Sequence, residues 1–155
     1  MELAVKARSL ARALAWGFAE PAPIVAWVDE LIVAQDRPDW FLLDASLAER
    51  RVPELVSALE SFADRTGSPP PQLVAHALLG HLHQWLLRHP EDGRRIARLL
   101  HHMVVESDLP ARGAEGDMYY FDDAYDLADS GVYGSVENVN DELKSFLEGF
   151  ARTAR

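Results

Sequence analysis

Six histidines in a chain without cysteine are the residues of this sequence with the chemistry to bind a metal ion. The clearest spacing is that of His102 and Glu106, which stand four residues apart and would share one face of a helix. Together with an acid from the segment after residue 116, they would form the His/carboxylate ligand set of a metal-dependent enzyme. The alternative interpretation is an exposed helical pair, which stabilises a helix by roughly a few tenths of a kcal/mol when the histidine is charged.

The cluster HALLGHLH, residues 76 to 83, resembles a second metal site, but helical geometry argues against one. At about 100° per residue, His81 points into the apolar face that contains Ala77, whereas His76 and His83 point to the opposite face, two turns apart. Two turns span roughly 11 Å, too far for one ion. His81 is therefore expected to be a core histidine.

Signatures of other reactions are absent from the sequence. It contains no H-E-x-x-H motif, no glycine-rich phosphate loop and no G-x-S-x-G nucleophile turn. The lack of cysteine also removes thiolate catalysis and disulfides. We therefore expect a protein that is not an enzyme and that uses no cofactor.

The segment GDMYYFDDAYDLADSGVYG, residues 116 to 134, mixes tyrosines with aspartates. If residues 117 to 129 form a helix, Met118, Phe121 and Tyr125 make a stripe that docks onto the core. The opposite side then presents an acidic and aromatic face: Tyr119, Asp122, Asp123, Asp126 and Asp129. Aspartates at i and i+4 repel one another, and aspartate and the aromatic residues are poor helix formers, so another part of the protein must compensate.

Three interpretations of this face remain open. It is a solvated surface that maintains solubility, a calcium site, or a protein-binding surface. The calcium loop pattern D-x-[DN]-x-[DN]-G is missing. For a protein-binding surface, tyrosines supply contact area at little entropic cost and carboxylates pair with Lys and Arg of a basic partner.

The distribution of charge narrows the class of partner. Residues 1 to 105 hold 13 acids and 11 bases, whereas residues 106 to 155 hold 12 acids and 4 bases, a net charge of −8 in the last third. Such a field repels nucleic acid and anionic membranes and attracts basic proteins. No apolar run approaches the roughly 20 residues of a membrane span, and the run 13 to 19 is too short for a signal peptide, so we expect a cytoplasmic protein.

The elements that must position these residues are helices. Apolar residues recur at spacings of three and four in stripes that begin near residues 3, 24, 52, 72, 96, 117 and 136, and the run from Pro38 is either a short helix or a brief strand. The helix at 72 to 88 is apolar nearly all round and is expected to be central. We predict one all-α domain over residues 1 to 155, a bundle of about seven helices built from helical hairpins. A flexible loop is expected at 111 to 116, followed by acidic C-terminal helices over 117 to 155.

Two stretches, 13 to 32 and 38 to 62, resemble a group of small helical bacterial proteins. The shared pattern is "I-x-x-W-x-D-x-L-I" followed by "L-x-D-x-S-L". In this chain the matching residues are Ile24, Trp27, Asp29, Leu31 and Ile32, and then Leu42, Asp44, Ser46 and Leu47. Small acidic members of that group are similar in build to immunity proteins, which bind and block a cognate toxin. The resemblance covers about the first 60 residues and transfers no inhibitory residue.

Our leading hypothesis is a cytoplasmic, immunity-type inhibitor that covers a basic partner such as a toxin. In it, Asp122, Asp123 and Asp126 pair with Lys or Arg of the partner and Tyr119 fills a pocket. One alternative is the metal-dependent enzyme that uses His102 and Glu106. Another is a helical scaffold or regulatory domain that self-associates through exposed aromatic residues such as Trp40 or Trp85.

Overall fold

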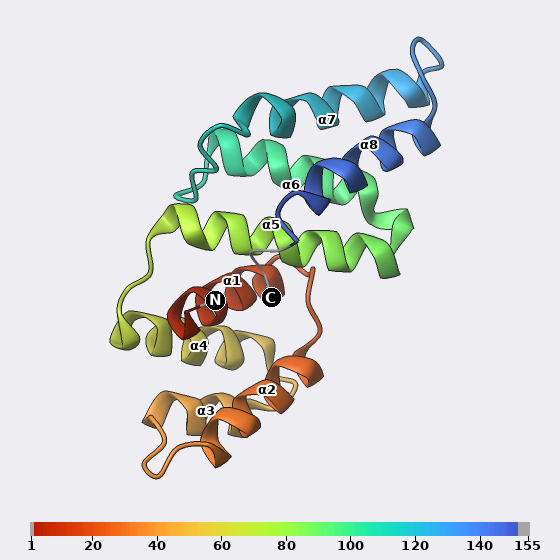
Figure 1. Ribbon diagram of the computed structural model, residues 1–155. Coiled ribbons are helices and arrows are strands. Elements are labelled where there is room, and N and C mark those ends of the chain that lie inside the picture. Colours follow the sequence, from red (N-terminus) through yellow and green to blue (C-terminus); the bar gives the residue numbers. More distant parts are fainter. Residues whose placement is uncertain (1, 152–155) are drawn as a thin grey trace. The chain divides into compact units, whose positions relative to one another are not determined.

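The computed structural model describes residues 2 to 151, and every regular element in that range is a helix (Figure 1). Eight α-helices and one short 3₁₀ turn are present there, so the all-α class and the bundle of about seven helices are confirmed. The contacts divide the chain into two compact units, Met1–Pro70 and Pro71–Arg155. The expectation of one domain stays a prediction.

The first unit contains α1 (Leu3–Ala15), α2 (Pro21–Val33), α3 (Trp40–Ala48) and α4 (Val52–Thr66). The run from Pro38 is thus a helix rather than a strand. Helix α4 packs against α1 and α3, and α2 packs against α3 (Figure 1). Helix α1 pairs chiefly with α4 and not with α2, the next helix along the chain. Its buried side is rich in alanine, such as Ala7 and Ala11, and small residues allow a close approach.

Local signals explain where these helices begin and how they are joined. Asp39 caps α3, since its side chain accepts a hydrogen bond of 2.9 Å from the Phe41 amide. The same carboxylate lies 3.2 Å from Arg65 on α4. Arg8 of α1 forms an ion pair with Asp64 of α4, so charged residues flank the apolar contacts of the unit.

The shared sequence pattern in this unit serves packing. Ile24 and Leu42 are buried in the core of the unit. The Ser46 hydroxyl donates a hydrogen bond of 2.6 Å to Asp29, which joins α3 to α2. Asp44 and Leu47, in contrast, are exposed. The pattern therefore specifies how two helices meet.

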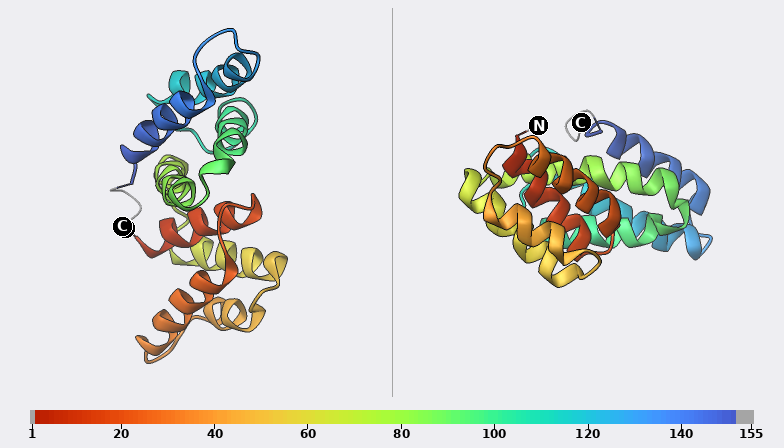
Figure 2. Two further views of the ribbon diagram at one scale, coloured as in Figure 1. Left: turned by 90° about the vertical axis from the view of Figure 1, so that its right-hand side faces the viewer. Right: turned by 90° about the horizontal axis from the view of Figure 1, so that it is seen from below.

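The second unit contains α5 (Pro71–Arg88), the 3₁₀ turn η1 (Pro90–Asp92), α6 (Gly93–Val105), α7 (Glu115–Asp129) and α8 (Val136–Glu148). Helix α7 packs against α6 and α8, and α5 packs against α8 (Figures 1 and 2). Ser135 is the N-cap of α8, because its hydroxyl accepts a hydrogen bond of 3.2 Å from the Asn138 amide. The loop predicted at 111 to 116 ends earlier than expected, since Glu115 and Gly116 belong to α7.

Helix α5 buries side chains around most of its circumference, as its composition predicts. The interpretation of its histidines was wrong in one respect: His83 is buried, whereas His81 is only partly so. Helix α8 covers the face that carries His76 and His83, and the His76 ring lies 5.3 Å from that of Phe150. The face of α5 with His76 and His83 is polar in sequence, but it is covered because α8 packs on it.

Candidate functional site

Helix α7 is anchored by the side that its spacing predicts. Met118, Phe121 and Tyr125 are all buried, and Ala124 is buried with them. Phe121 packs against Phe146 of α8 with ring centroids 5.4 Å apart. The predicted docking stripe is confirmed, and its opposite side is left at the surface.

Tyr125 forms the polar part of this anchor. Its hydroxyl donates a hydrogen bond to the side-chain oxygen of Asn140 on α8, directly beside Gly93, the first residue of α6. Burial raises the pKa of Tyr125 to about 12, and the charge of the nearby Arg94 opposes that rise only in part. The hydroxyl is therefore protonated at neutral pH and acts as a hydrogen-bond donor.

Arg94 of α6 supplies the compensation that the acidic face requires. Its guanidinium forms ion pairs with Asp126, at 3.0 Å, and with Asp129. It also donates a hydrogen bond of 3.0 Å to the Tyr125 carbonyl oxygen. One cation from α6 thus offsets the repulsion between two aspartates of α7.

Asp122 and Tyr119 both contact His101 of α6. The Asp122 carboxylate lies 3.4 Å from Nδ1 of His101, and the Tyr119 ring meets the His101 ring edge-on at 4.7 Å. Asp122 is partly buried by this contact, whereas Tyr119 keeps 50% of its surface exposed. His101 of α6 therefore contacts two of the five residues of the predicted face.

Asp123 is the remaining acid of the predicted face. It is exposed and, among residues 2 to 151, takes part in no ion pair. The five predicted residues therefore divide into two groups. Asp122, Asp126 and Asp129 each have a basic neighbour on α6, whereas Asp123 is exposed and Tyr119 keeps half of its surface exposed beside His101.

Sequence reasoning missed several surface residues next to this face. Of the large apolar side chains exposed between residues 119 and 136, only Tyr119 belongs to the predicted face. The others are Tyr120, Leu127, Val132, Tyr133 and Val136. We call Tyr119, Tyr120, Asp123 and Leu127 the outer ridge of α7, and Val132 with Tyr133 the tip. The tip side chains are 71% and 73% exposed.

The tip has a defined backbone. Gly131 and Gly134 take left-handed conformations, with φ of 69° and 70°, which side chains disfavour. The amides of Val132 and Tyr133 both bond to the Leu127 carbonyl, at 3.1 and 3.4 Å, so the loop folds back onto the end of α7. Figures 1 and 2 show this loop projecting where α7 and α8 meet. The sequence signal that could have indicated this tip is the pattern G-V-Y-G, in which two apolar residues stand between turn glycines.

A groove of about 580 Å³ lies on the surface between α7 and α8. Its lining mixes aromatic and acidic side chains: Asp117, Tyr120, Phe121, Asp141, Glu142, Ser145 and Phe146. The Tyr120 hydroxyl donates a hydrogen bond of 3.1 Å to Glu142 across it. Partial burial raises the pKa of Tyr120, and Glu142 and Tyr133 raise it further. This groove was not predicted, because its two walls are at least 20 residues apart in sequence.

The metal alternative gains no third ligand. His102 and Glu106 form the expected helical pair, with Nδ1 and the carboxylate 3.2 Å apart. Within residues 2 to 151, however, no three histidine, aspartate or glutamate side chains are grouped closely enough to hold an ion. The acid expected from the late segment does not join them.

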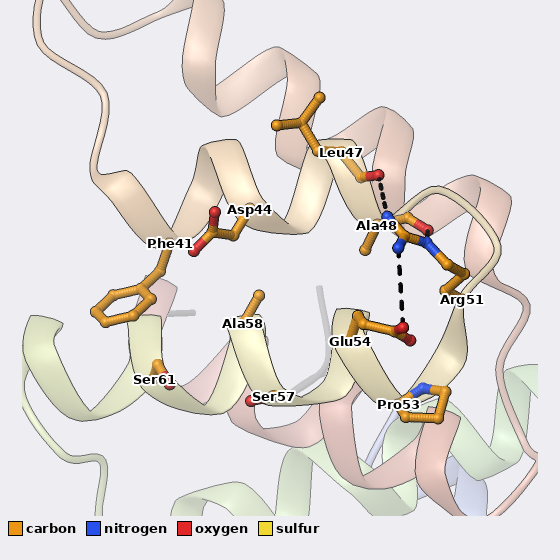
Figure 3. Close-up of a pocket in the computed structure, with 10 residues that line it drawn as sticks. All are labelled: Phe41, Asp44, Leu47, Ala48, Arg51, Pro53, Glu54, Ser57, Ala58 and Ser61. Atoms are coloured by element: carbon orange, nitrogen blue, oxygen red, sulfur yellow. Dashed lines mark hydrogen bonds and ion pairs between the residues drawn. The ribbon is translucent and has the colours of Figure 1, made fainter.

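A second groove, of about 510 Å³, lies between α3 and α4 (Figure 3). Its only basic group, Arg51, donates to the carbonyl oxygens of Leu47 and Ala48, at 3.0 and 3.4 Å, and lies 3.9 Å from Glu54. The Arg51 guanidinium is therefore already engaged by partners within the chain. The lining also contains two hydroxyls and the carboxylate of Asp44, and no histidine.

Of the two tryptophans proposed for self-association, one is exposed and the other is buried. Trp40 is 67% exposed, as that alternative requires. Trp85 was wrongly expected at the surface: it is 9% exposed, and its Nε1–H donates a hydrogen bond of 2.8 Å to Asp92. The His89 ring stacks on it at 4.2 Å. Trp85 is therefore part of the corner between α5 and α6.

No protein-family model matches the chain, and it matches no curated protein and no solved structure. Among the described residues, no helix is both long and apolar enough to cross a membrane.

Proposed function

We propose that this protein binds and inhibits a basic protein partner, in the manner of an immunity protein that covers the working site of a toxin. The observation that supports the proposal is the surface of α7 and its tip. There, Tyr119, Tyr120 and Tyr133 are exposed beside the acid Asp123, which has no ion-pair partner in residues 2 to 151. Exposed tyrosines near unbalanced acids are typical of a surface that desolvates aromatic anchors and pairs with cations.

The charge of the segment indicates what kind of partner is favoured. Residues 106 to 155 carry 12 acids and 4 bases, and Arg94 balances only two of those acids through side-chain pairs. The remaining field accelerates encounter with a positively charged protein and repels phosphate backbones. A nuclease or another toxin with a basic substrate site has the complementary charge.

The immunity role itself rests on the resemblance of residues 13 to 62 to small helical bacterial proteins. The first unit would then be the part held in common, and the α7 surface the part that selects a partner. Cytoplasmic location belongs to the same proposal, because an inhibitor of this kind must be present before its toxin acts on the cell.

The experiment that tests the proposal is site-specific photocrosslinking in cells of the source organism. A benzophenone amino acid replaces Tyr133 in one strain, Asp123 in a second and Ser57, an exposed residue of the first unit, in a control strain. We expect one basic protein to be captured from positions 133 and 123 and not from position 57. Expression of that protein alone is expected to arrest growth, and co-expression of this chain is expected to restore it.

Matched variants separate binding from folding. Tyr119→Ala combined with Asp123→Lys is expected to release the captured protein and to lower the thermal unfolding midpoint only slightly, since Asp123 is exposed and Tyr119 loses only its edge-on contact with His101. Asp36→Lys makes an equal charge change at an exposed site of the first unit. This variant is expected to keep binding the captured protein. Equal capture from all three crosslinking positions, or retention by the double variant, would contradict the proposal.

Self-association is a second candidate function, supported by a specific observation in the first unit. Val33, Trp40 and Leu47 expose large apolar surfaces there. Sedimentation equilibrium of the purified chain tests it: a concentration-dependent dimer that Trp40→Ser abolishes would support a scaffold role. A monomer at all concentrations would exclude it.

A further inference from the structure

The groove between α7 and α8 has an aromatic floor. Phe121 is buried and Phe146 is half-buried, with ring centroids 5.4 Å apart and planes tilted by 50°. The Tyr120 ring meets Phe121 edge-on at 5.4 Å and continues the floor towards the outer ridge of α7. A side chain that enters the groove therefore meets apolar ring faces and edges.

The rim of the groove is acidic. Asp117 stands on the α7 side and takes part in no ion pair within residues 2 to 151. Asp141 and Glu142 stand on the α8 side. The nearby cation is Lys144, whose Nζ is 3.9 Å from Asp141. Within residues 2 to 151, Glu142 accepts a single hydrogen bond, of 3.1 Å, from Tyr120. Among the described residues, the rim thus holds three acids and one paired cation.

The arrangement of these acids indicates the shape of the cation that fits. In the described part of the chain, no three acidic or histidine side chains converge closely enough for a metal ion. The acids are spread around an apolar floor instead, which suits an elongated cation with an apolar stem. Arginine fits better than lysine, because its planar guanidinium stacks on aromatic rings and offers five donors to separate carboxylates.

We propose that the groove between α7 and α8 binds an arginine side chain of a protein partner, with the stem over Phe121 and Phe146 and the guanidinium at the acidic rim. This inference rests on the proposed function and specifies which group of the partner enters the surface. The outer ridge of α7 then lies beside the bound arginine and contacts its neighbours in the partner. An apolar residue next to the arginine would pack against Tyr120.

The test uses the full chain and a defined probe. The ¹⁵N-labelled protein is titrated with the capped hexapeptide Ala-Leu-Arg-Ala-Leu-Arg and followed by NMR. We expect amide shifts at Phe121, Ser145 and Phe146, weaker binding of the lysine version and none of the glutamine version. Absence of shifts at about 5 mM peptide, enough to populate a site of millimolar affinity, would overturn the inference.

Variants locate the binding in the groove. Asp141→Asn combined with Glu142→Gln is expected to weaken the peptide about tenfold, because charge-assisted hydrogen bonds are lost. Ser145→Arg is expected to abolish binding by placing a guanidinium in the groove from within the chain. The matched controls are Glu137→Gln and Ser57→Arg, both exposed and outside the groove lining, and both are expected to bind normally.

The outcomes also separate this inference from the proposed function. If the partner captured by crosslinking is retained by Ser145→Arg and does not compete with the peptide, the groove inference is wrong and the proposed function stands. If the peptide binds the groove but no basic protein is captured from positions 123 and 133, the groove inference stands and the proposed function is wrong. Peptide binding that is unchanged in both groove variants overturns the inference.

Discussion

Tyr125 of α7 and Asn140 of α8 are joined by a hydrogen bond that leaves no space above Gly93, the first residue of α6. A Cβ atom at Gly93 would lie 2.1 Å from Oδ1 of Asn140 and 2.2 Å from the Tyr125 hydroxyl oxygen. Both distances are far below van der Waals contact. Three helices of the second unit therefore meet at a point that requires a glycine, and this junction holds α7 in the position from which its outer ridge is presented.

Gly93→Ala is expected to destabilise the protein. Gly93 has ordinary helical angles, with φ of −52°, so alanine would otherwise be favoured by about 1 kcal/mol. The added methyl group forces Asn140 to turn away and pushes on the buried ring of Tyr125, which has no free space. We expect a net loss of about 1–3 kcal/mol in the free energy of unfolding, measured by urea denaturation.

Gly116→Ala is the matched control. Gly116 also lies within a helix, but among the described residues no atom outside its own helix backbone and its chain neighbours stands within 4 Å of its would-be Cβ. This variant is expected to be as stable as the natural protein or more stable, by up to about 1 kcal/mol. If both variants changed stability by the same amount, the close contact at Gly93 would not be the cause.

The stability of the protein is expected to fall between pH 10 and pH 12 because of Tyr125. Burial raises the pKa of this hydroxyl to about 12 in the folded protein, above its ordinary value of 10.0. The folded state therefore holds the proton more tightly than the unfolded state. The protonated hydroxyl of Tyr125 makes its full contribution to the free energy of unfolding below pH 10. That contribution, about 2–3 kcal/mol, is lost as the pH rises through 12. Denaturation curves at pH 9, 10.5 and 11.5 measure the change.

Tyr125→Phe isolates this contribution from other groups that titrate in the same range. The variant loses the hydrogen bond to Asn140 and is expected to be about 1 kcal/mol less stable at pH 7. Because it has no hydroxyl to ionise, its stability is expected to fall less steeply above pH 10. Parallel pH profiles for the two proteins would show that Tyr125 is not the titrating group.

The buried side of α7 was predictable from the sequence, because a helix that docks on a core repeats its apolar residues with a helical period. Met118, Phe121 and Tyr125 follow that period and are buried. Ser135 is a second local signal, since it begins α8 and its hydroxyl accepts a hydrogen bond from a backbone amide of the first turn. These features depend only on residues within one or two helical turns.

The neighbours of the acidic face were not predictable in this way. Arg94 and Asp126 are 32 residues apart, and no local spacing indicates that α6 would place its arginine there. The tip was missed because Val132 and Tyr133 lie in a turn, where no period relates a residue to its exposure. The groove of α7 and α8 likewise depends on how two helices pack. Sequence alone thus identified the segment, and tertiary contacts decided which of its residues remain available.

Arg94→Gln is expected to lower the free energy of unfolding by about 1 kcal/mol. The guanidinium pairs with Asp126 and Asp129 and donates to the Tyr125 carbonyl oxygen. The carboxylates are largely exposed, so each pair contributes little by itself, but the loss also restores the repulsion between the two aspartates. Arg94→Lys is expected to cost nearly as much, because one ammonium group cannot reach three acceptors. Thermal unfolding at low salt measures both.

Arg98→Gln is the control for that substitution. Arg98 is exposed on the same helix and takes part in no ion pair within residues 2 to 151. Its loss is expected to change stability by less than about 0.5 kcal/mol. An equal effect of the two substitutions would indicate that net charge, and not the Arg94 contacts, stabilises the unit.

Asp92 is expected to make the corner between α5 and α6 sensitive to acid. Burial alone would raise the pKa of this carboxyl, but hydrogen bonds from Trp85 and Arg95 and the nearby positive charges outweigh it, so the pKa lies below 3.8. The stabilisation is therefore present above about pH 4 and is lost as the pH falls through the folded-state pKa. Asp92→Asn is expected to be about 1 kcal/mol less stable at pH 7, with a difference that shrinks between pH 4 and pH 2.

A double-mutant cycle separates the two donors that act on Asp92. Trp85 Nε1 lies 2.8 Å from one carboxylate oxygen and Arg95 lies 2.9 Å from the other. Trp85→Phe removes the first donor, and its coupling with Asp92→Asn in urea denaturation at pH 7 is expected to be about 1 kcal/mol. Because Arg95 is largely exposed, its coupling is expected to be smaller and to decline in high salt. If the coupling with Arg95 were the larger of the two, the acid sensitivity would come from charge rather than from the buried hydrogen bond of Trp85.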